Sequence, residues 1–384
     1  MDQFIFSAAE LARYNRHIII PGFGMEAQEK LKKAKVLVVG AGGLGSPVLL
    51  YLAAAGIGTI GIVECDVVDD SNLQRQVLYG TADVGTAKAE AAKKRLLSLN
   101  PHIHIIIHDT ELRSSNAMDI ISAYDIVADG TDNFPTRYLV NDACVLMDKP
   151  NVYASIYQFE GQVAVFNYVD SNGERGPNYR DLYPVPPEPG EVANCSEAGV
   201  LGVLPGIIGS MQALEVIKIA AQTGDVLSGR LFLFDALSFE TRTFNISRNP
   251  ENPINGSNPT LRALIDYEQF CGVPAMEKKI KNVSPEQLQD WQQEGIVYQL
   301  IDVREQQEYD LVNLGGLLIP LDTIGDLPQK IDKDKKVVIH CKSGGRSAKA
   351  VRLLEEKYGF TNLYNLEGGL IAYIYALELD LPVY

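Results

Sequence analysis

The sequence predicts an α/β fold: a Rossmann-like nucleotide-binding domain with a mixed sheet, followed by a smaller α/β domain. Three observations lead to this prediction. A glycine-rich turn joins an apolar strand to a helix near the start of the chain, the composition changes after residue 247, and a second strand runs into a turn that contains Cys341. Strands that alternate with helical patterns are typical of sheets covered by helices.

The first of these features is the run from Val36 to Ser46. Its four apolar residues up to Val39 predict a buried strand, and the run Pro47–Ala55 has a composition that suits a helix. Glycines at positions 40, 42 and 45 lie between them. Because glycine has no Cβ, the backbone there can approach a phosphate, whose charge is attracted by free N–H groups and the helix dipole. The turn therefore predicts nucleotide binding, with a tight turn that binds nothing as the alternative.

Length, charge and cysteine content limit the number of domains, the partners and the location to be expected. The chain has 384 residues, enough for two or three domains, and a formal net charge of −15. This charge argues against nucleic acid as a partner, since nucleic-acid phosphates are bound by lysine and arginine. The five cysteines are scattered and do not suggest a disulfide framework. The longest uncharged apolar run, 200–214, is short for a membrane span, and Met1 begins no secretory signal, so we expect a cytoplasmic protein without a membrane segment.

An acidic residue follows the next predicted strand, Thr59–Val63. Glu64 lies about twenty residues beyond the glycines, where an acid usually holds the hydroxyls of a ribose. A nicotinamide-dependent enzyme and an ATP-dependent enzyme both fit this position.

Cations and further carboxylates favour ATP. Arg75 and Lys88 could stabilise the negative charge that develops on the leaving phosphates of a triphosphate. A dinucleotide does not require such cationic side chains. The predicted strand 124–128 ends in the run Asp129–Asn133, a carboxylate-rich edge suited to Mg²⁺. Each charge alone could be a solvated surface group, but their occurrence together after a glycine turn predicts binding of ATP with Mg²⁺.

The remaining elements of the first domain are predicted from apolar runs. They are strands at 162–168, 230–234 and 241–246 and a helix at 207–221. Between them, Gly176–Cys195 contains five prolines, so we expect a long surface loop without a helix. Cys195, at its end, is either a functional thiol or an inert one.

A second domain follows a stretch rich in Asn, Pro and charge at 247–256. We place the first domain at 1–247, a linker at 248–277 and the second domain at 278–384. The run Ser284–Gln287 is a capping box that opens a helix, and strands are expected at 299–303 and 336–340. The second of these strands leads into Cys341–Arg346 and a helix from Ser347. Backbone N–H groups around Cys341, with Arg346 nearby, should lower the pKa of the thiol and stabilise an anionic sulfur.

Six motifs together resemble a known pair of families: Arg13–Arg16, Gly40–Gly45, Ser71–Gln76, Thr131–Asn133, Asn194-Cys195 and Cys341–Arg346. Residues 12–247 resemble the bacterial relatives of ubiquitin-activating enzymes in the MoeB/ThiF superfamily, and residues 278–384 resemble a rhodanese domain. The fusion is similar to molybdopterin-synthase sulfurylases of the MoeZ type. The resemblance implies adenylation of a small ubiquitin-like sulfur carrier that ends in Gly-Gly, followed by sulfur transfer to a thiocarboxylate.

The resemblance also implies site residues. For ATP they are Gly40, Gly42, Gly43, Gly45, Glu64, Ser71, Asn72, Leu73, Gln74, Arg75, Lys88, Asp132 and Asn133, with Asp132 on Mg²⁺. The resemblance assigns catalytic roles to Arg75, Lys88, Cys195 and Cys341. It also implies that Arg16 reaches the nucleotide of a second subunit in a homodimer. The persulfide loop would comprise Cys341, Lys342, Ser343, Gly344, Gly345 and Arg346, with Arg304 nearby.

Two departures from the family pattern change expectations. Many relatives hold structural zinc through two C-x-x-C pairs, whereas the matching positions here are Asn178 with Asp181 and Asn252 with Asn255, so no structural zinc is expected. The rhodanese turn that usually reads His-Ile-Pro-Gly-Ala is here Asn313–Leu317, which weakens the expectation of thiosulfate sulfurtransferase activity. The sulfur donor, a cysteine desulfurase or thiosulfate, therefore stays open.

Two other functions remain as alternatives. One is a nicotinamide-dependent oxidoreductase built on the same glycine turn. The other is a non-catalytic scaffold that binds the carrier.

Overall fold

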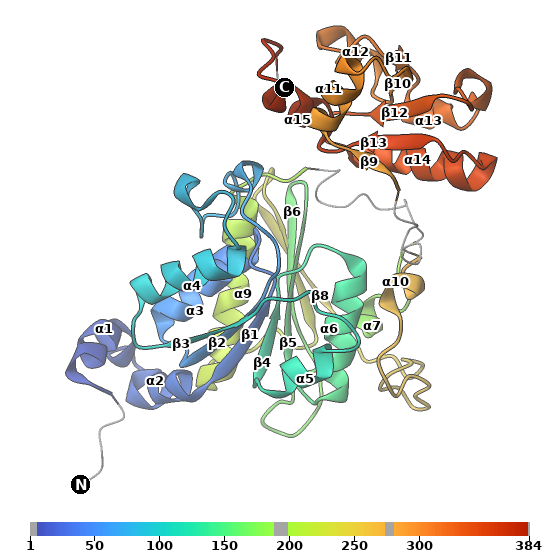
Figure 1. Ribbon diagram of the computed structural model, residues 1–384. Helices are drawn as coiled ribbons and strands as arrows, with labels where there is room; N and C mark the ends of the chain where they lie inside the picture. The colour runs from blue at the N-terminus through green and yellow to red at the C-terminus, as the bar shows by residue number, and fades with distance from the viewer. Residues whose placement is uncertain (1–5, 188–198, 273–279, 383–384) are drawn as a thin grey trace. The chain divides into compact units, whose positions relative to one another are not determined.

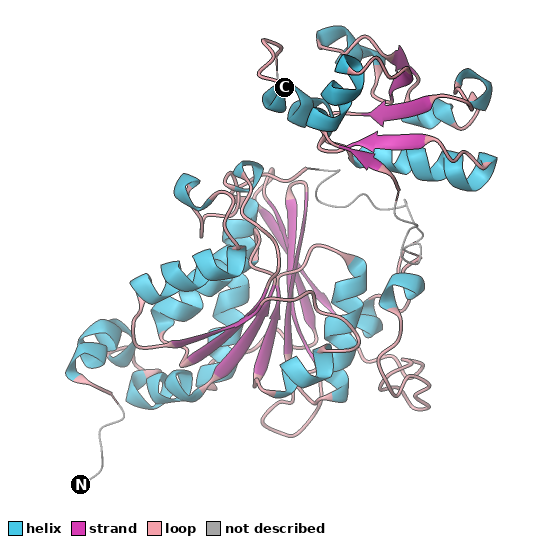
Figure 2. Cartoon of the chain, in the orientation of Figure 1, coloured by secondary structure: helices cyan, strands magenta, loops and turns pink. Residues whose placement is uncertain are grey.

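The computed structural model describes residues 6–187, 199–272 and 280–382 (Figures 1 and 2). The chain divides into two compact units, one up to residue 273 and one from residue 274. Both units are α/β, as Figure 2 shows, so the predicted fold class is confirmed. The domain limits drawn from composition, with a linker at 248–277, stay a prediction.

The first unit is built on an eight-stranded mixed sheet. Its strands are β1 Lys35–Val39, β2 Thr59–Val63, β3 His104–His108, β4 Ile126–Asp129, β5 Asn151–Tyr157, β6 Glu160–Phe166, β7 Arg230–Asp235 and β8 Glu240–Asn245. Their order across the sheet is β3-β2-β1-β4-β5-β6-β7-β8. The first five strands in this order are parallel, and β6, β7 and β8 are added in antiparallel fashion.

Helices cover both faces of this sheet (Figure 1). They are α1 Ala8–Ile18, α2 Gly24–Lys33, α3 Gly45–Ala55, α4 Lys88–Leu99, α5 Ala117–Ser122, α6 Phe134–Leu146, α7 Tyr179–Leu182, α9 Leu204–Ala221 and α10 Tyr267–Phe270. Alternate residues of β1 point to opposite sides: Val36 and Val38 pack with α3 and α9, and Leu37 and Val39 pack with α6. A strand buried on both faces explains the uninterrupted apolar run in the sequence.

Helix α9 is the one helix among the described residues that is long and apolar enough to cross a membrane by length and composition. It packs against α3 and against β5 and β6, and 56% of its apolar window is buried inside the unit. A central core helix of an α/β domain has this composition because apolar neighbours surround it.

The segment 176–195 differs from the predicted proline-rich surface loop. It contains the short helix α7, so the prediction of a loop without a helix was wrong there. Asn178 caps this helix: its side chain accepts a hydrogen bond from Arg180 N, and its own N–H donates to the Asp181 carboxylate. Tyr179 and Arg180 are buried. The prolines only begin to dominate after α7, and Cys195 lies outside the described residues.

The segment that follows β8 packs against the rest of the first unit. Three of its residues, Asn252, Ile254 and Tyr267, are buried. The Tyr267 hydroxyl donates to Asp142 Oδ2 at 2.7 Å, and the same carboxylate is paired with the buried Arg180 guanidinium at 2.8 and 2.7 Å. This buried ion pair therefore links α6, α7 and α10.

The four positions that match the zinc ligands of relatives lie together beside this pair. Asn178 Nδ2 donates to Asn255 Oδ1 at 2.9 Å, and Asn252 Nδ2 donates to Asp181 Oδ1 at 2.6 Å and to Asn178 Oδ1 at 3.3 Å. Asp181 Oδ1 also accepts from Asn249 N. These oxygens are already hydrogen-bond acceptors, and the set has no thiolate, so it does not fit a tetrahedral zinc site.

We therefore expect the purified protein to contain no stoichiometric zinc. A hydrogen-bonded amide and carboxylate cluster would connect the two segments that a metal connects in relatives. Elemental analysis and thermal unfolding with and without a chelator check this, and we expect an unchanged Tm. About one zinc per chain that survives chelation would contradict the prediction.

The second unit is a five-stranded parallel sheet with the order β11-β10-β12-β13-β9. Its strands are β9 Asn282–Val283, β10 Tyr298–Asp302, β11 Leu317–Leu318, β12 Lys336–His340 and β13 Leu363–Leu366. Its helices are α11 Pro285–Gln293, α12 Gln306–Leu311, α13 Leu321–Ile324, α14 Gly345–Tyr358 and α15 Gly369–Ala376. The predicted capping box is confirmed, since Ser284 Oγ accepts from Gln287 N at the start of α11.

Candidate active sites

The first candidate site lies where the strand order of the first unit reverses. The chain leaves β1 for β2 and β3 on one side and later adds β4 on the other side of β1. The loops after β1 and β4 separate at such a point, and ligands of open α/β sheets bind there. A cavity of about 240 Å³ opens between them. Eight of the predicted nucleotide-site residues line it: Gly40, Gly42, Gly43, Glu64, Arg75, Lys88, Asp132 and Asn133.

Two glycines of the turn are required by its geometry. Gly40 has φ +87°, and a Cβ there would lie 3.1 Å from the carbonyl oxygen of Gly130. A Cβ on Gly45 would lie 2.0 Å from the carbonyl oxygen of Gly40. Gly45 is thus needed for the tight entry into α3 and does not itself line the cavity among the described residues.

Glu64 is held at the rim of the cavity by backbone donors. Its carboxylate accepts from Ala41 N at 3.0 Å, Cys65 N at 3.0 Å and Asp66 N at 2.9 Å. The side chain therefore connects the end of β2 to the glycine turn and has a fixed orientation. A fixed acceptor at this place suits a pair of ribose hydroxyls.

Two cations reach the cavity from different elements. Arg75 Nη1 donates to the carbonyl of Ser71 at 3.0 Å. Lys88, the first residue of α4, forms an ion pair with Asp66 at 3.0 Å. The Lys88 side chain is 7% exposed and that of Asp66 is 68% exposed. A polyphosphate that enters the cavity can therefore compete for a buried ammonium whose present partner is largely in solvent.

Carboxylate and amide groups line the opposite side, after β4. Asp132 is exposed to the cavity, and Asn133 caps α6 by accepting from Thr136 N at 2.9 Å. A single carboxylate at the mouth of a phosphate site fits Mg²⁺, which binds proteins through one or two carboxylates and takes its other oxygens from phosphate and water.

Other predicted residues lie away from the cavity. Ser71, Asn72, Leu73 and Gln74 are not among the described residues that line it; they form a 3₁₀ turn, Asp70–Asn72, and the residues after it, which position Arg75. Arg16 is exposed on α1 and does not line the cavity of its own chain. Cys195 lies outside the described residues.

The sequence analysis missed Arg137, in the first turns of α6. It lines the cavity, is 7% exposed and lies over the rings of Phe134 and Tyr153, 5.7 and 5.8 Å from their centres. Its Nη2 donates to the carbonyl of Thr131 at 3.3 Å. Burial raises the pKa of nearby Asp129, although the Arg137 guanidinium opposes this rise. The sequence position of Arg137 could have indicated this, since a helix that starts directly after Asn133 brings its first turns to the same edge of the sheet.

The second candidate site is the turn that joins β12 to α14. Cys341 follows β12 and is 1% exposed. Its Sγ accepts hydrogen bonds from Gly344 N at 3.2 Å and from Ser347 Oγ at 3.5 Å. Hydrogen-bond donors of this kind stabilise a negatively charged sulfur atom. The loop Cys341–Arg346 is thus folded around the cysteine sulfur.

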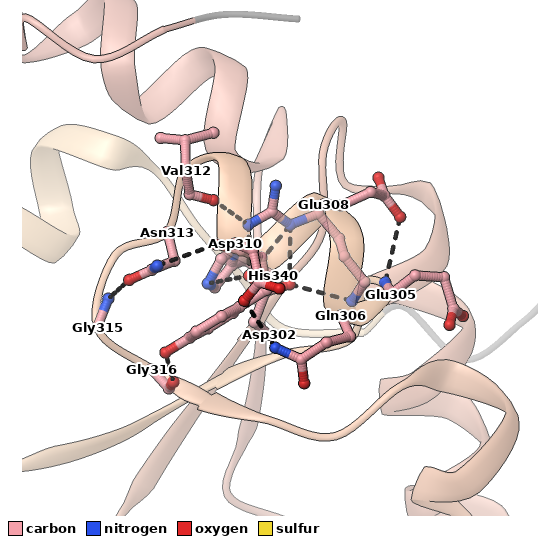
Figure 3. Close-up of polar contacts among 12 residues, drawn as sticks. Asp302, Glu305, Gln306, Glu308, Asp310, Val312, Asn313, Gly315, Gly316 and His340 are labelled. Atoms are coloured by element: carbon pink, nitrogen blue, oxygen red, sulfur yellow. Dashed lines mark hydrogen bonds and ion pairs between the residues drawn. The ribbon is translucent and has the colours of Figure 1, made fainter.

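Both arginines predicted for this site have carboxylate partners. Arg304 is fully buried, pairs with Asp302 at 2.6 Å and donates to the carbonyl of Val312 at 2.7 Å. His340 lies beside Asp302, with 3.7 Å between Nε2 and Oδ2 (Figure 3). Burial lowers the pKa of His340, which favours the neutral ring, although the nearby Asp302 carboxylate opposes this shift. Arg346 pairs with Glu308 at 2.6 Å.

Comparison with known families agrees with this geometry. The family model described as ThiF family matches residues 14–254. The chain belongs to the ThiF family. A second model, described as Rhodanese-like domain, matches residues 284–375. The resemblance inferred from the six motifs is thus confirmed for both parts of this ThiF-family chain.

Relatives share this order of domains or the first part of it. The probable adenylyltransferase/sulfurtransferase MoeZ of Mycobacterium tuberculosis is 48% identical over 98% of this chain and 96% of its own length. The adenylyltransferase and sulfurtransferase MOCS3 of Drosophila grimshawi is 42% identical over 100% of this chain and 88% of its own. The sulfur carrier protein adenylyltransferase of Thermus thermophilus is 55% identical but covers 69% of this chain and 97% of its own length.

Among solved structures, the crystal structure of E. coli MccB with ATP is 24% identical to this ThiF-family chain, with a TM-score of 0.56. The match covers 65% of this chain and 75% of that one. At this identity the likeness shows the fold alone.

Proposed function

We propose that this ThiF-family chain uses ATP to activate the C-terminal carboxylate of a small ubiquitin-like sulfur carrier and then converts it to a thiocarboxylate. One observation carries the proposal. A single chain holds a cavity with cations at the switch point of a nucleotide-binding sheet and a cysteine folded into a donor-rich loop. Relatives named adenylyltransferase/sulfurtransferase match nearly all of it, which supports adenylation plus sulfur transfer over the nicotinamide and scaffold alternatives.

In the first reaction, an oxygen of the carrier carboxylate attacks the α-phosphorus of ATP. The bond from the α-phosphorus to the bridging oxygen breaks, and pyrophosphate leaves with the electron pair. Arg75 and Lys88 would offset the charge that develops on the phosphates, and Glu64 would hold the ribose. Asp132 would hold Mg²⁺, which when bound neutralises phosphate charge. The product is an acyl-adenylate with an electrophilic carbonyl.

In the second reaction, the terminal sulfur of a persulfide on Cys341 attacks this carbonyl and AMP leaves. The resulting acyl disulfide releases the thiocarboxylate when a thiol attacks Cys341 Sγ. Cys195 and external thiols are the candidates for this step, which leaves a disulfide that a further thiol reduces.

The assembly and location belong to the same proposal. We propose a homodimer, because Arg16 is exposed on α1 and does not line the cavity of its own chain, as expected of a residue that serves a second subunit. We propose a cytoplasmic enzyme that uses ATP and Mg²⁺ without structural zinc. Its sulfur comes from a cysteine desulfurase or thiosulfate.

Mass spectrometry of candidate carriers tests this function. Carriers of the molybdopterin, cysteine, thiamine and tRNA-thiolation pathways would each be incubated with the enzyme, MgATP and a sulfur donor. A carrier that gains the mass difference between sulfur and oxygen is the substrate. Pyrophosphate exchange into ATP without any mass gain would support adenylation but contradict sulfur transfer, and no exchange with any carrier would contradict the proposal at its first step.

A further inference from the structure

A buried amide lies beside the glycine turn of the first unit. Gln76, the last residue of the motif Ser71–Gln76, lines the candidate nucleotide cavity and is 4% exposed. Its main chain is fixed, because its N–H donates to the carbonyl of Asn72 at 2.9 Å and its carbonyl accepts from Tyr79 N at 3.2 Å. The motif thus ends in an uncharged polar side chain that has no role in the reaction described above.

The side chain of Gln76 has no hydrogen-bond partner among the residues that the structure describes, and its Oε1 is buried. A buried amide that serves the fold is normally satisfied within it. Gln28 is such a case: its Nε2 donates to the carbonyl of Ala55 at 2.8 Å, and its Oε1 is 3.0 Å from His17 Nδ1. The unsatisfied amide of Gln76 in a cavity therefore indicates a group that is kept for a ligand.

The nitrogen of this amide lies next to the glycine turn. A Cβ built on Gly42 would be 3.7 Å from Gln76 Nε2. The Gly42 carbonyl is already used inside α3, since it accepts from Ser46 N at 2.9 Å and from Ser46 Oγ at 2.7 Å. The Tyr79 hydroxyl donates to the carbonyl of Ala41 at 2.9 Å, so the segment after Gln76 is held against the turn. The amide nitrogen thus has a fixed support at the place where the backbone of a glycine turn binds phosphate.

An amide donor supplies something that the two cations of the cavity do not. Arg75 and Lys88 bring positive charge, whereas a glutamine N–H donates a directional hydrogen bond without adding charge. Because Oε1 is buried, the negative end of the amide is kept away from an anion at the turn. A carboxylate in the same position would repel a phosphate. An anionic ligand therefore explains why an amide stands here.

We propose that Gln76 is a further nucleotide-binding residue, which donates a hydrogen bond from Nε2 to a phosphate oxygen of ATP and thereby orients the polyphosphate at the turn. This inference rests on the proposed function, because ATP is the ligand. It predicts that Gln76 contributes to the binding of nucleotides with phosphate groups and contributes nothing to the binding of adenosine.

Titration of the full chain with MgATP, followed by calorimetry, tests this prediction, and adenosine, followed by ligand-observed NMR, is the probe without phosphate. Gln76→Met keeps the length of the side chain and removes the amide. We expect the Kd for MgATP to rise about tenfold, the usual effect of losing a hydrogen bond to a charged group. Gln76→Glu keeps the shape and places a negative charge beside the phosphates. At about pH 8, where a carboxyl group is ionised, we expect a rise of about a hundredfold.

A charge control and a stability control accompany these variants. Ala82 is exposed on the 3₁₀ turn Thr81–Asp83 and is not among the described residues that line the cavity. Ala82→Glu therefore adds the same charge to a neighbouring part of the chain and should bind MgATP like wild type. Thermal unfolding of each variant shows whether it is folded.

An equal loss of affinity for MgATP and for adenosine would overturn the proposal, since Gln76 would then only shape the cavity. Unchanged MgATP binding in Gln76→Met would overturn it as well. So would tighter binding in Gln76→Glu, because the side chain would then face a metal ion or a hydroxyl group instead of a phosphate. Failure of the wild type to bind MgATP would instead contradict the proposed function of the cavity.

Discussion

Cys341→Ala should leave adenylation at the wild-type rate and abolish sulfur transfer from a sulfane donor. The two proposed reactions use different units of the chain, since the candidate nucleotide cavity is lined by residues of the first unit and Cys341 follows β12 in the second. Alanine removes the one atom that can carry the persulfide. The expected loss is complete, because no rate remains for a covalent step without its nucleophile. Pyrophosphate exchange and carrier mass, measured on one sample, report the two reactions separately.

Free sulfide provides the control for this variant. Sulfide can attack an acyl-adenylate directly, so we expect it to restore some thiocarboxylate in Cys341→Ala. Ser347→Ala is a matched variant that removes one hydrogen bond to the sulfur and keeps the thiol; it should slow transfer and not abolish it. Thiocarboxylate formed by Cys341→Ala from a persulfide donor at the wild-type rate would show that another thiol carries the sulfur.

Cys195 is the second cysteine with a proposed role, and Cys195→Ala tests it. We propose that Cys195 captures the activated carrier transiently or resolves the acyl disulfide. Its loss should slow thiocarboxylate release and leave adenylation and Cys341 loading intact. Wild-type release in the absence of added thiol would show that Cys195 has no role in the cycle.

Local chemistry explains what the sequence could predict. The strand up to Val39, the turn after it and the helix from Gly45 are visible because apolar residues, glycines and a helix start follow each other within twenty residues. The same holds for β12 and the loop at Cys341. Glu64, Lys88 and Asp132 could be predicted at one cavity because each follows a strand or starts a helix at the carboxyl edge of a parallel sheet.

Other features depend on contacts that no local pattern reports. Strands β3 and β5 were missed, although their runs His104–His108 and Asn151–Tyr157 are partly apolar, because both are short and neither shows a regular alternation of apolar and polar residues. The partner of Arg346 could not be foreseen, since Glu308 is 38 residues away in sequence. The same limit applies to the cluster of Asn178, Asp181, Asn252 and Asn255, whose members the sequence shows only as missing cysteines.

Arg75→Ala, Lys88→Ala and Asp132→Ala should each lower pyrophosphate exchange by roughly 10²–10³, the usual effect of removing one electrostatic contact to a transition state. All three residues line one cavity and come from three separate segments of the chain: Arg75 from the loop after the 3₁₀ turn, Lys88 from the start of α4 and Asp132 from the loop after β4. Lys88 is the most informative of them. It is buried, and it forms an ion pair with the solvent-exposed Asp66, a partner that contributes little to stability.

The three variants should therefore fold normally, and thermal unfolding checks this. Lys94→Ala is the matched control, because Lys94 lies on the exposed side of the same helix α4 and should exchange pyrophosphate at the wild-type rate. Lys88→Arg keeps the charge but changes its shape, and a partial recovery is expected if charge is what the phosphates require. If all three alanine variants kept near-normal exchange, ATP would not bind at the switch point between β1 and β4, and the assignment of this cavity would be wrong.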